Sequence, residues 1–293
     1  MVFTETSIVY FNETDGLPAD YVLESFENKY DRGWNAIYRQ GAAVENVAIV
    51  NDTTARNLTS MALYCDPADD KGLVTGASVR TARQDIFFGS FRASMRAPRQ
   101  WFKGSAVSML LKHNITESWD IDVMNTDNSS WAWVTTLAKG QFSDLWMGTN
   151  FTNLTEDGLN PWYYTEYRVD WTPDAITYYI GGQPRYAYTR ALNGSLPSTP
   201  APIQLQHWSL GNVYNTQGPP GQQSEANVAW TRLFFNSSIW TTEQREAFDA
   251  RCTPADACQM DDNTLRALQR TQLKHFLPGS RLSRSTRFFG YLF

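Results

Sequence analysis

Two carboxyl groups stand two residues apart in the stretch ESWDIDVMN, residues 117–125. In a β-strand such residues share a face, so Asp120 and Asp122 are expected side by side. A one-residue irregularity, expected at Val123-Met124, would bring Asn125 to the same face. Paired acids on one strand are costly unless they are solvated, hydrogen-bonded or used in a reaction. The stretch is therefore either a solvated strand face or a site where carboxyl groups act on a substrate.

Aromatic side chains follow these acids at strand spacing. The alternation WAWVT places Trp131 and Trp133 on one face of a second strand, and His207 and Trp208 end a later one. Eleven Trp and fourteen Tyr are many for 293 residues, and aromatic rings line clefts as well as cores. These tryptophans, with Trp119, are therefore either core residues or substrate contacts. His207 is either a satisfied core or rim histidine or a proton shuttle and hydrogen-bond donor.

The composition excludes several classes of protein. A net charge of −5 argues against a nucleic-acid partner. No run of about 18 apolar residues is present, so no membrane-spanning helix is expected. Three Cys and three scattered His do not form a metal-binding pattern. We therefore predict neither a metal nor a cofactor, and we expect a small-molecule or oligosaccharide ligand.

Short alternating segments separated by turn residues dominate the chain. Phe91, Ala93 and Met95 alternate with polar residues, and residues 107–111 form a more apolar segment typical of an inner strand. Thr172-Pro173-Asp174 has the chemistry of a hairpin turn. Many short strands of this kind predict an all-β sandwich.

The end of the chain differs from the rest. Thr241-x-x-Gln244 is a capping box, which predicts a short helix to about Arg251, and residues 264–275 are a second candidate helix. From residue 263 onward the chain carries Lys and Arg but no acid. We therefore expect one β-sandwich domain over residues 1–260 and a basic extension over residues 261–293.

Three further segments carry a resemblance to a known family. They are the run from Thr81-Ala82-Arg83-Gln84-Asp85 to Pro98, the hairpin over residues 164–182, and the strand at residues 202–208. In order and spacing they resemble the glycoside hydrolase family 16 enzymes, the laminarinase and β-glucanase relatives, over roughly residues 75–240. The resemblance implies a jelly roll of two antiparallel sheets with a cleft across one concave face. It also implies that Trp208 lies in that cleft.

The resemblance gives the acidic strand a specific meaning. The family motif is E-x-D-x-x-E, in which the first Glu is the nucleophile, the Asp orients it and the last Glu is the general acid/base. Laid on this chain, the motif falls on Asp120, Asp122 and Asn125. The shortened first acid lies roughly 1–1.5 Å too far back, and a misplacement of about 1 Å can cost about a hundredfold in rate. An amide cannot replace the general acid/base, a loss of about 10²–10⁴-fold.

Three functions remain compatible with this altered motif. The first is a family 16 hydrolase with weak or changed activity on β-glucan. The second is a glycan-binding protein that has lost catalysis, since aromatic faces stack on sugars. The third, which we predict, is a pericyclic cyclisation of the Diels–Alder kind on a small apolar molecule. Such a reaction needs shape, aromatic walls and hydrogen-bond donors but no nucleophile.

Sequons and cysteines indicate a secreted protein. Nine N-x-S/T sequons are more than chance would give and predict a glycosylated surface; they lie at Asn12, Asn51, Asn57, Asn114, Asn128, Asn150, Asn153, Asn193 and Asn236. Residues 1–3 do not begin a signal peptide, so we expect a leader to have been removed. Cys252 and Cys258 enclose a short loop and are expected to form a disulfide, which leaves Cys65 over.

Overall fold

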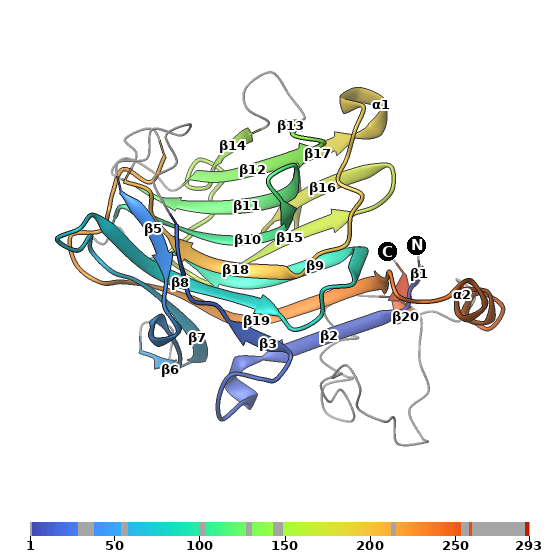
Figure 1. The fold of residues 1–293 in the computed structure, drawn as a ribbon, viewed down its shortest axis with the longest axis horizontal. Coiled ribbons are helices and arrows are strands. Elements are labelled where there is room, and N and C mark those ends of the chain that lie inside the picture. The colour runs from blue at the N-terminus through green and yellow to red at the C-terminus, as the bar shows by residue number, and fades with distance from the viewer. Residues whose placement is uncertain are drawn as a thin grey trace.

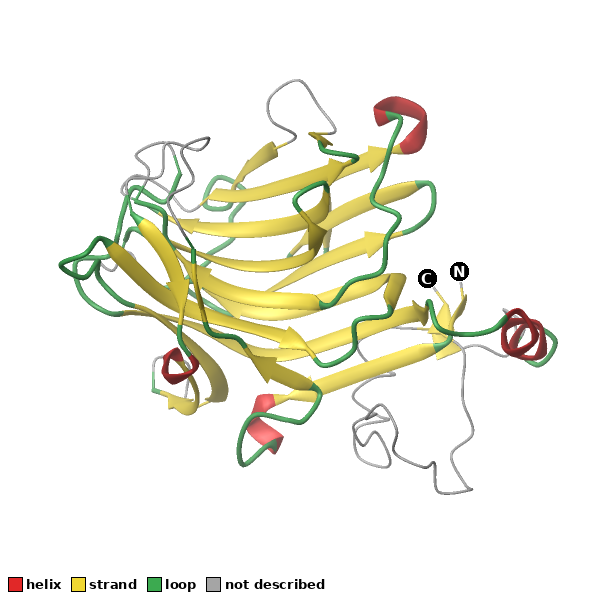
Figure 2. Ribbon diagram, viewed as in Figure 1, coloured by secondary structure: helices red, strands yellow, loops and turns green. Residues whose placement is uncertain are grey.

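The computed structural model describes residues 2–28, 38–53, 58–99, 103–126, 131–142, 149–211, 215–252, 258–259 and 291–292. Two large β-sheets lie against each other, with short helices at the margins (Figures 1 and 2). The predicted all-β sandwich is therefore confirmed.

One sheet carries the acidic stretch and has ten strands. Its described neighbours pair antiparallel except for β5 and β8, which are parallel. In spatial order the strands are β13 (Gln141–Phe142), β12 (Trp131–Ala138), β11 (Glu117–Asn125), β10 (Ser105–Asn114), β18 (Ile203–Trp208), β8 (Leu73–Thr81), β5 (Arg39–Ala42) and β4 (Phe26–Glu27), with β14 (Thr149–Asn153) on β12 and β3 (Tyr21–Leu23) on β8.

The second sheet has eight strands, and its described pairs are all antiparallel. In spatial order they are β17 (Gln183–Thr189), β16 (Ala175–Ile180), β15 (Thr165–Trp171), β9 (Ile86–Arg96), β19 (Ser224–Ser237), β7 (Leu58–Cys65) and β6 (Val47–Asp52), with β2 (Glu5–Tyr10) on β19. The predicted hairpin around residues 172–174 is the β15–β16 connection.

The core lies between the two sheets. From β11 it receives Trp119, Ile121 and Val123, which alternate with more exposed neighbours. From β9 it receives Phe91 and Met95. The rings of Trp119 and Phe91 stack with centroids 5.4 Å apart, so the acidic strand is held against the opposite sheet. Burying aromatic rings of this size contributes strongly to a core of this kind.

The two ends of the chain lie side by side (Figure 1). β1 (Val2–Phe3) pairs antiparallel with β21 (Tyr291–Leu292), which pairs parallel with β20 (Cys258–Gln259). Thus the last part of the predicted extension pairs with the first strand of the domain. The second candidate helix, residues 264–275, lies outside the described residues.

Helices are short and lie outside the two sheets. The predicted capping box is confirmed: Thr241 caps α2 (Thr242–Asp249) by accepting a hydrogen bond from the Gln244 backbone N–H, and the Gln244 side chain accepts one in return. Among the described residues the other helices are α1 (Arg190–Asn193) and the 3₁₀ turns Phe11–Glu13 and Val44–Asn46.

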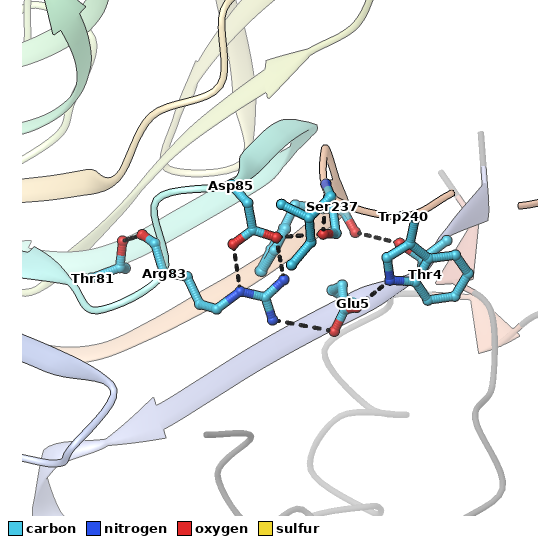
Figure 3. A network of polar contacts seen from close by, with 9 residues as sticks. Thr4, Glu5, Thr81, Arg83, Asp85, Ser237 and Trp240 are labelled. Carbon is cyan, nitrogen blue, oxygen red and sulfur yellow. Dashed lines mark hydrogen bonds and ion pairs between the residues drawn. The ribbon is translucent and has the colours of Figure 1, made fainter. Parts of the chain in front are cut away.

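Arg83 and Asp85, in the run before β9, connect three parts of the fold (Figure 3). Arg83 binds Asp85 through two hydrogen bonds, of 2.6 and 2.5 Å, and lies 3.5 Å from Glu5 on β2. Asp85 also accepts a hydrogen bond from Ser237 at the end of β19, and Glu5 accepts one from Trp240 at 2.9 Å. This cluster therefore joins β2, β19 and the turn before β9, which is a structural role.

Gly76 allows β8 and β18 to approach each other, and its replacement is the first prediction. A Cβ at this position would meet the backbone oxygen of His207 at 2.1 Å, so backbone must shift. We expect Gly76→Ala to lower the free energy of unfolding by about 1–3 kcal/mol, measured by urea denaturation. The control is Gly16→Ala, where a Cβ meets nothing within 4 Å and the change should stay within about 0.5 kcal/mol. Equal stability of the two variants would contradict the close approach.

Candidate active site

Polar side chains form a row across the outer face of the ten-stranded sheet, the face turned away from the core. Strand register places Asp122 on β11 opposite Ser108 on β10 and Trp133 on β12. Ser108 in turn lies opposite Gln206 on β18, which lies opposite Ser78 on β8. Because directly opposite residues share a face, five strands present these groups on one side.

A second row runs beside the first and contains the other acid. Asp120 lies opposite Leu110 on β10 and Thr135 on β12. Leu110 is opposite Gln204 on β18, and Gln204 is opposite Arg80 on β8. The predicted adjacency of the two aspartates on one face is therefore present.

Hydrogen bonds orient Asp122. Trp208 Nε1 donates to Ser108 Oγ at 2.7 Å, and Ser108 Oγ donates to Asp122 Oδ1. The chain Trp208–Ser108–Asp122 thus fixes one carboxyl oxygen and links the acid to an aromatic side chain two strands away. A side chain held by packing and hydrogen bonds loses little entropy when a ligand binds.

A further carboxylate, Glu24, lies at the β8 end of the two rows and was not predicted from the sequence. Glu24 accepts hydrogen bonds from Ser78 Oγ at 2.7 Å and Gln204 Nε2 at 3.2 Å, and it pairs with Arg80 at 3.2 Å. It precedes β4 in a segment without a motif. Only the pairing of β3 with β8 brings it here, so no local sequence signal could have found it.

Burial raises the pKa values of both aspartates. It raises the pKa of Asp122 to about 6, although hydrogen bonds from Ser108 and Asp120 oppose the shift. It raises the pKa of Asp120 well above its usual range, and the charge of Asp122 raises it further, against a hydrogen bond from Thr135. Two carboxyl groups this close share a proton because both cannot ionise cheaply. Near neutral pH the pair therefore offers one proton donor beside one carboxylate.

Asn125 does not join the pair, so its predicted place in the site is wrong. β10 and β11 pair without irregularity from Ser105↔Asn125 through Ala106↔Met124 to Ser108↔Asp122. Regular alternation turns Asn125 to the core side, where it is fully buried and donates to the Arg99 carbonyl at 3.3 Å. Met124 takes the next place after Asp122 on the outer face. The third position of the site is therefore a thioether.

Trp119 and His207 also point to the core, which corrects their prediction as substrate contacts. Trp119 is fully buried against Phe91. His207 is fully buried, with Nδ1 2.8 Å from the Leu63 carbonyl on the other sheet and Nε2 2.8 Å from Ser105 Oγ. Burial lowers the pKa of His207 to about 4, so it is neutral at physiological pH and bridges the sheets. In their strands Trp119 and His207 each lie next to residues that point to the outer face, such as Asp120 and Trp208.

The remaining tryptophans lie on the outer face. Trp133 and Trp208 are half-buried and occupy the rows described above. Trp131, two residues before Trp133, is 36% exposed. The site thus has three aromatic side chains around its polar rows, as the alternation predicted.

Cys252 differs from its prediction, whereas Cys65 has no disulfide partner, as expected. Cys252 carries a free thiol, so the structure does not contain the predicted disulfide with Cys258, whose side chain lies outside the described residues. Cys65 is a buried free thiol whose pKa burial raises. In the core, a free cysteine such as Cys65 packs like a small apolar residue and needs no disulfide partner.

The sequons are distributed over several edges of the sandwich. Asn12, Asn51 and Asn114 are exposed, and Asn153 and Asn236 are half-buried. Asn57 and Asn128 lie outside the described residues, as do the side chains of Asn150 and Asn193. Their glycosylation stays a prediction.

The described part of the chain contains no group of three or more His, Cys, Asp or Glu side chains placed to hold a metal ion. Nor does any of its helices have the length and apolar character needed to cross a bilayer.

Together these features define a jelly-roll β-sandwich with a carboxyl pair on the outer face of one sheet. The model of glycosyl hydrolases family 16 matches residues 35–232. The chain belongs to this family.

One relative in sequence and two solved structures with a similar fold illustrate these similarities. Crh-like protein 3 of Botryotinia fuckeliana (strain B05.10) is 27% identical over 143 residues, which is 45% of this chain and 30% of that protein. The chain therefore matches less than a third of that relative's length. The fold of Bacillus licheniformis β-glucanase superposes with a TM-score of 0.62 at 16% identity, covering 78% of this chain and 97% of that one. A Bacteroides ovatus mixed linkage glucan family 16 protein, solved in complex with its product, gives 0.58 at 12% identity, covering 78% and 99%.

The raised pKa of the pair gives a second prediction. Asp122 has a higher pKa folded than unfolded, so the folded state binds more protons and loses stability as pH rises from about 4 to about 6. We expect Asp122→Asn to remove this loss and to raise the free energy of unfolding by about 1–3 kcal/mol at pH 7.5, with little effect at pH 4. Thermal denaturation across pH 4–8 measures it.

The control for that series is Asp15→Asn at an exposed aspartate, which should leave the pH profile parallel to that of the wild type. A profile for Asp122→Asn that also runs parallel to the wild type would show that the pair does not titrate as described.

Proposed function

We propose that the outer face of the ten-stranded sheet binds a β-glucan chain without efficient hydrolysis. The observation that carries the proposal is Met124, which occupies the outer-face position next to Asp122 on a regular strand. Hydrolysis with retention needs two carboxyl groups about 5 Å apart, one attacking and one transferring a proton. Asp120 and Asp122 instead interact directly with each other, and a thioether transfers no proton.

The groups on this face suit a sugar chain. Ser108, Gln206 and Ser78 provide hydroxyl and amide groups in one row, and adjacent strands place them about 4.8 Å apart. Protonated Asp120 can donate to a sugar hydroxyl while Asp122 accepts from one. Trp133 and Trp208 supply aromatic surface beside these groups. The β-glucanase and mixed linkage glucan names of similar structures support glucan as the class of ligand.

The predicted cyclisation of a small apolar molecule is the second candidate. Two apolar residues favour it. Ala106 on β10 lies opposite both Met124 on β11 and Trp208 on β18, so apolar side chains adjoin the carboxyl pair on this face. Asn125, which was expected to provide a hydrogen bond for such a reaction, points to the core. The cyclisation proposal therefore depends on the carboxyl pair and the aromatic side chains.

Glucan binding is tested through Trp133. We expect Trp133→Ala to weaken binding of laminarin, lichenan or xyloglucan oligosaccharides by about tenfold, because an aromatic platform of this size contributes about 1.5 kcal/mol. Isothermal titration calorimetry measures it, with reducing-end release followed in parallel. Tyr163→Ala, which removes a 66% exposed aromatic ring from the loop before β15, is the control and should bind normally.

Two results would contradict the binding proposal. Absence of binding to every glucan by the wild type would direct the search to small apolar substrates. Efficient release of reducing ends that disappears in Asp120→Ala would show that the protein is a β-glucan hydrolase that uses Asp120.

The role of Met124 gives a further prediction. Met124 is 1% exposed, so Met124→Glu places a carboxyl group beside Asp122 at a nearly buried position, where it can transfer a proton to a ligand bound against it. We expect reducing-end release from β-glucan to rise by about 10²-fold over the wild type. Met124→Gln has the same shape without the acid and should remain inactive. If both variants fold and bind glucan but are equally inactive, the missing acid is not what limits hydrolysis.

A further inference from the structure

Three arginines stand in register on the outer face of the eight-stranded sheet, on the side of the molecule opposite to the carboxyl pair. Arg92 on β9 lies directly opposite Arg168 on β15 and Arg232 on β19. Like charges directly opposite each other destabilise a sheet. Asp170 and Glu166 compensate part of this charge, which leaves three arginines against two carboxylates.

The two flanking arginines have partners of their own. Arg168 donates to Asp170 at 2.7 Å and lies over the Tyr179 ring, 4.3 Å from its centroid. Arg232 donates to the Tyr10 hydroxyl at 2.8 Å and lies 4.2 Å from the Trp230 ring centroid. Hydrogen bonds and aromatic faces thus fix both guanidinium groups on either side of Arg92.

Arg92 is less well satisfied than its neighbours. Its side chain is 5% exposed, and its hydrogen bond is a 3.2 Å contact from Nε to Ser90 Oγ. That hydroxyl donates to Asp170, which is already bound by Arg168. Glu166 and Asp170 supply negative charge near Arg92, against the charges of the two flanking arginines. Among the described residues its side-chain hydrogen bond is the one from Nε. Burial and the two neighbouring arginines still disfavour the charge of Arg92, so a bound anion would add compensation that Glu166 and Asp170 do not complete.

We propose that Arg92, flanked by Arg168 and Arg232, binds a tetrahedral oxyanion, phosphate or sulfate, either free or as a monoester. The planar guanidinium fork of Arg92 matches two oxygens of such a group. Strands about 4.8 Å apart place the flanking guanidinium groups within reach of the remaining oxygens. The two sheets and the core separate this position from the carboxyl pair, so the proposal is independent of glucan binding.

Anion titration of the folded protein tests the site. Phosphate, sulfate and methyl phosphate are added at constant ionic strength against sodium chloride, and the melting temperature and calorimetric Kd are followed. We expect saturable stabilisation by the oxyanions beyond that by chloride. Arg92→Gln should weaken binding by at least about tenfold, since hydrogen bonds to charged groups contribute about 1.5–3 kcal/mol. Arg92→Lys, which keeps the charge but loses the fork, should lose most of the affinity.

The matched control is Arg39→Gln, which removes the same charge from the other sheet, where Arg39 pairs with Glu27. It should bind the oxyanions like the wild type. Methyl phosphate binding as tightly as phosphate would indicate a group carried on a larger molecule, and tighter binding of the free ions would indicate a free ion. No saturable effect of any oxyanion on the wild type, or an equal effect on Arg92→Gln, would overturn the proposal. The wild-type titration decides the question even if a variant does not fold.

Discussion

The stacking of Trp119 on Phe91 sets the geometry on which the site depends. It holds β11 against the opposite sheet, so that every second residue of this strand must point into the core. Because strand periodicity is two, a shift of one residue would turn Asp120 and Asp122 inward and expose the apolar set. The large aromatic ring makes that exchange very unfavourable. The outward position of the acids is therefore fixed by the core-facing residues that alternate with them, Trp119, Ile121 and Val123, rather than by the acids themselves.

The same constraint explains which parts of the site could be predicted. The alternation of β11 and β12 was sufficient to place Asp120, Asp122, Trp131 and Trp133 on one face. The β-sandwich itself followed from short alternating segments, and the α2 cap followed from a local motif. These features depend on neighbours in sequence, which the chain displays directly.

What could not be predicted depends on pairing between distant strands. We expected an irregularity at residues 123–124 from the sequence. The pairing of β10 with β11 is regular there, and Asn125 turns inward. The sequence left His207 as either a core histidine or a proton shuttle, and its contacts with Leu63 and Ser105 on distant strands make it a core histidine. Glu24 joins the site through β3, which no motif marks. The register of a sheet is a property of two segments, and a single segment carries little information about it.

The buried His207 has a consequence for the whole domain when it is considered with the carboxyl pair. A histidine whose pKa falls to about 4 on folding makes the domain less stable as pH drops from about 6.5 to about 4. The carboxyl group of Asp122 has the opposite slope over much of the same interval. The two groups lie on opposite faces of one sheet and offset each other. Protonation of Asp122 near pH 6 therefore offsets part of the stability that the domain loses through His207 on acidification.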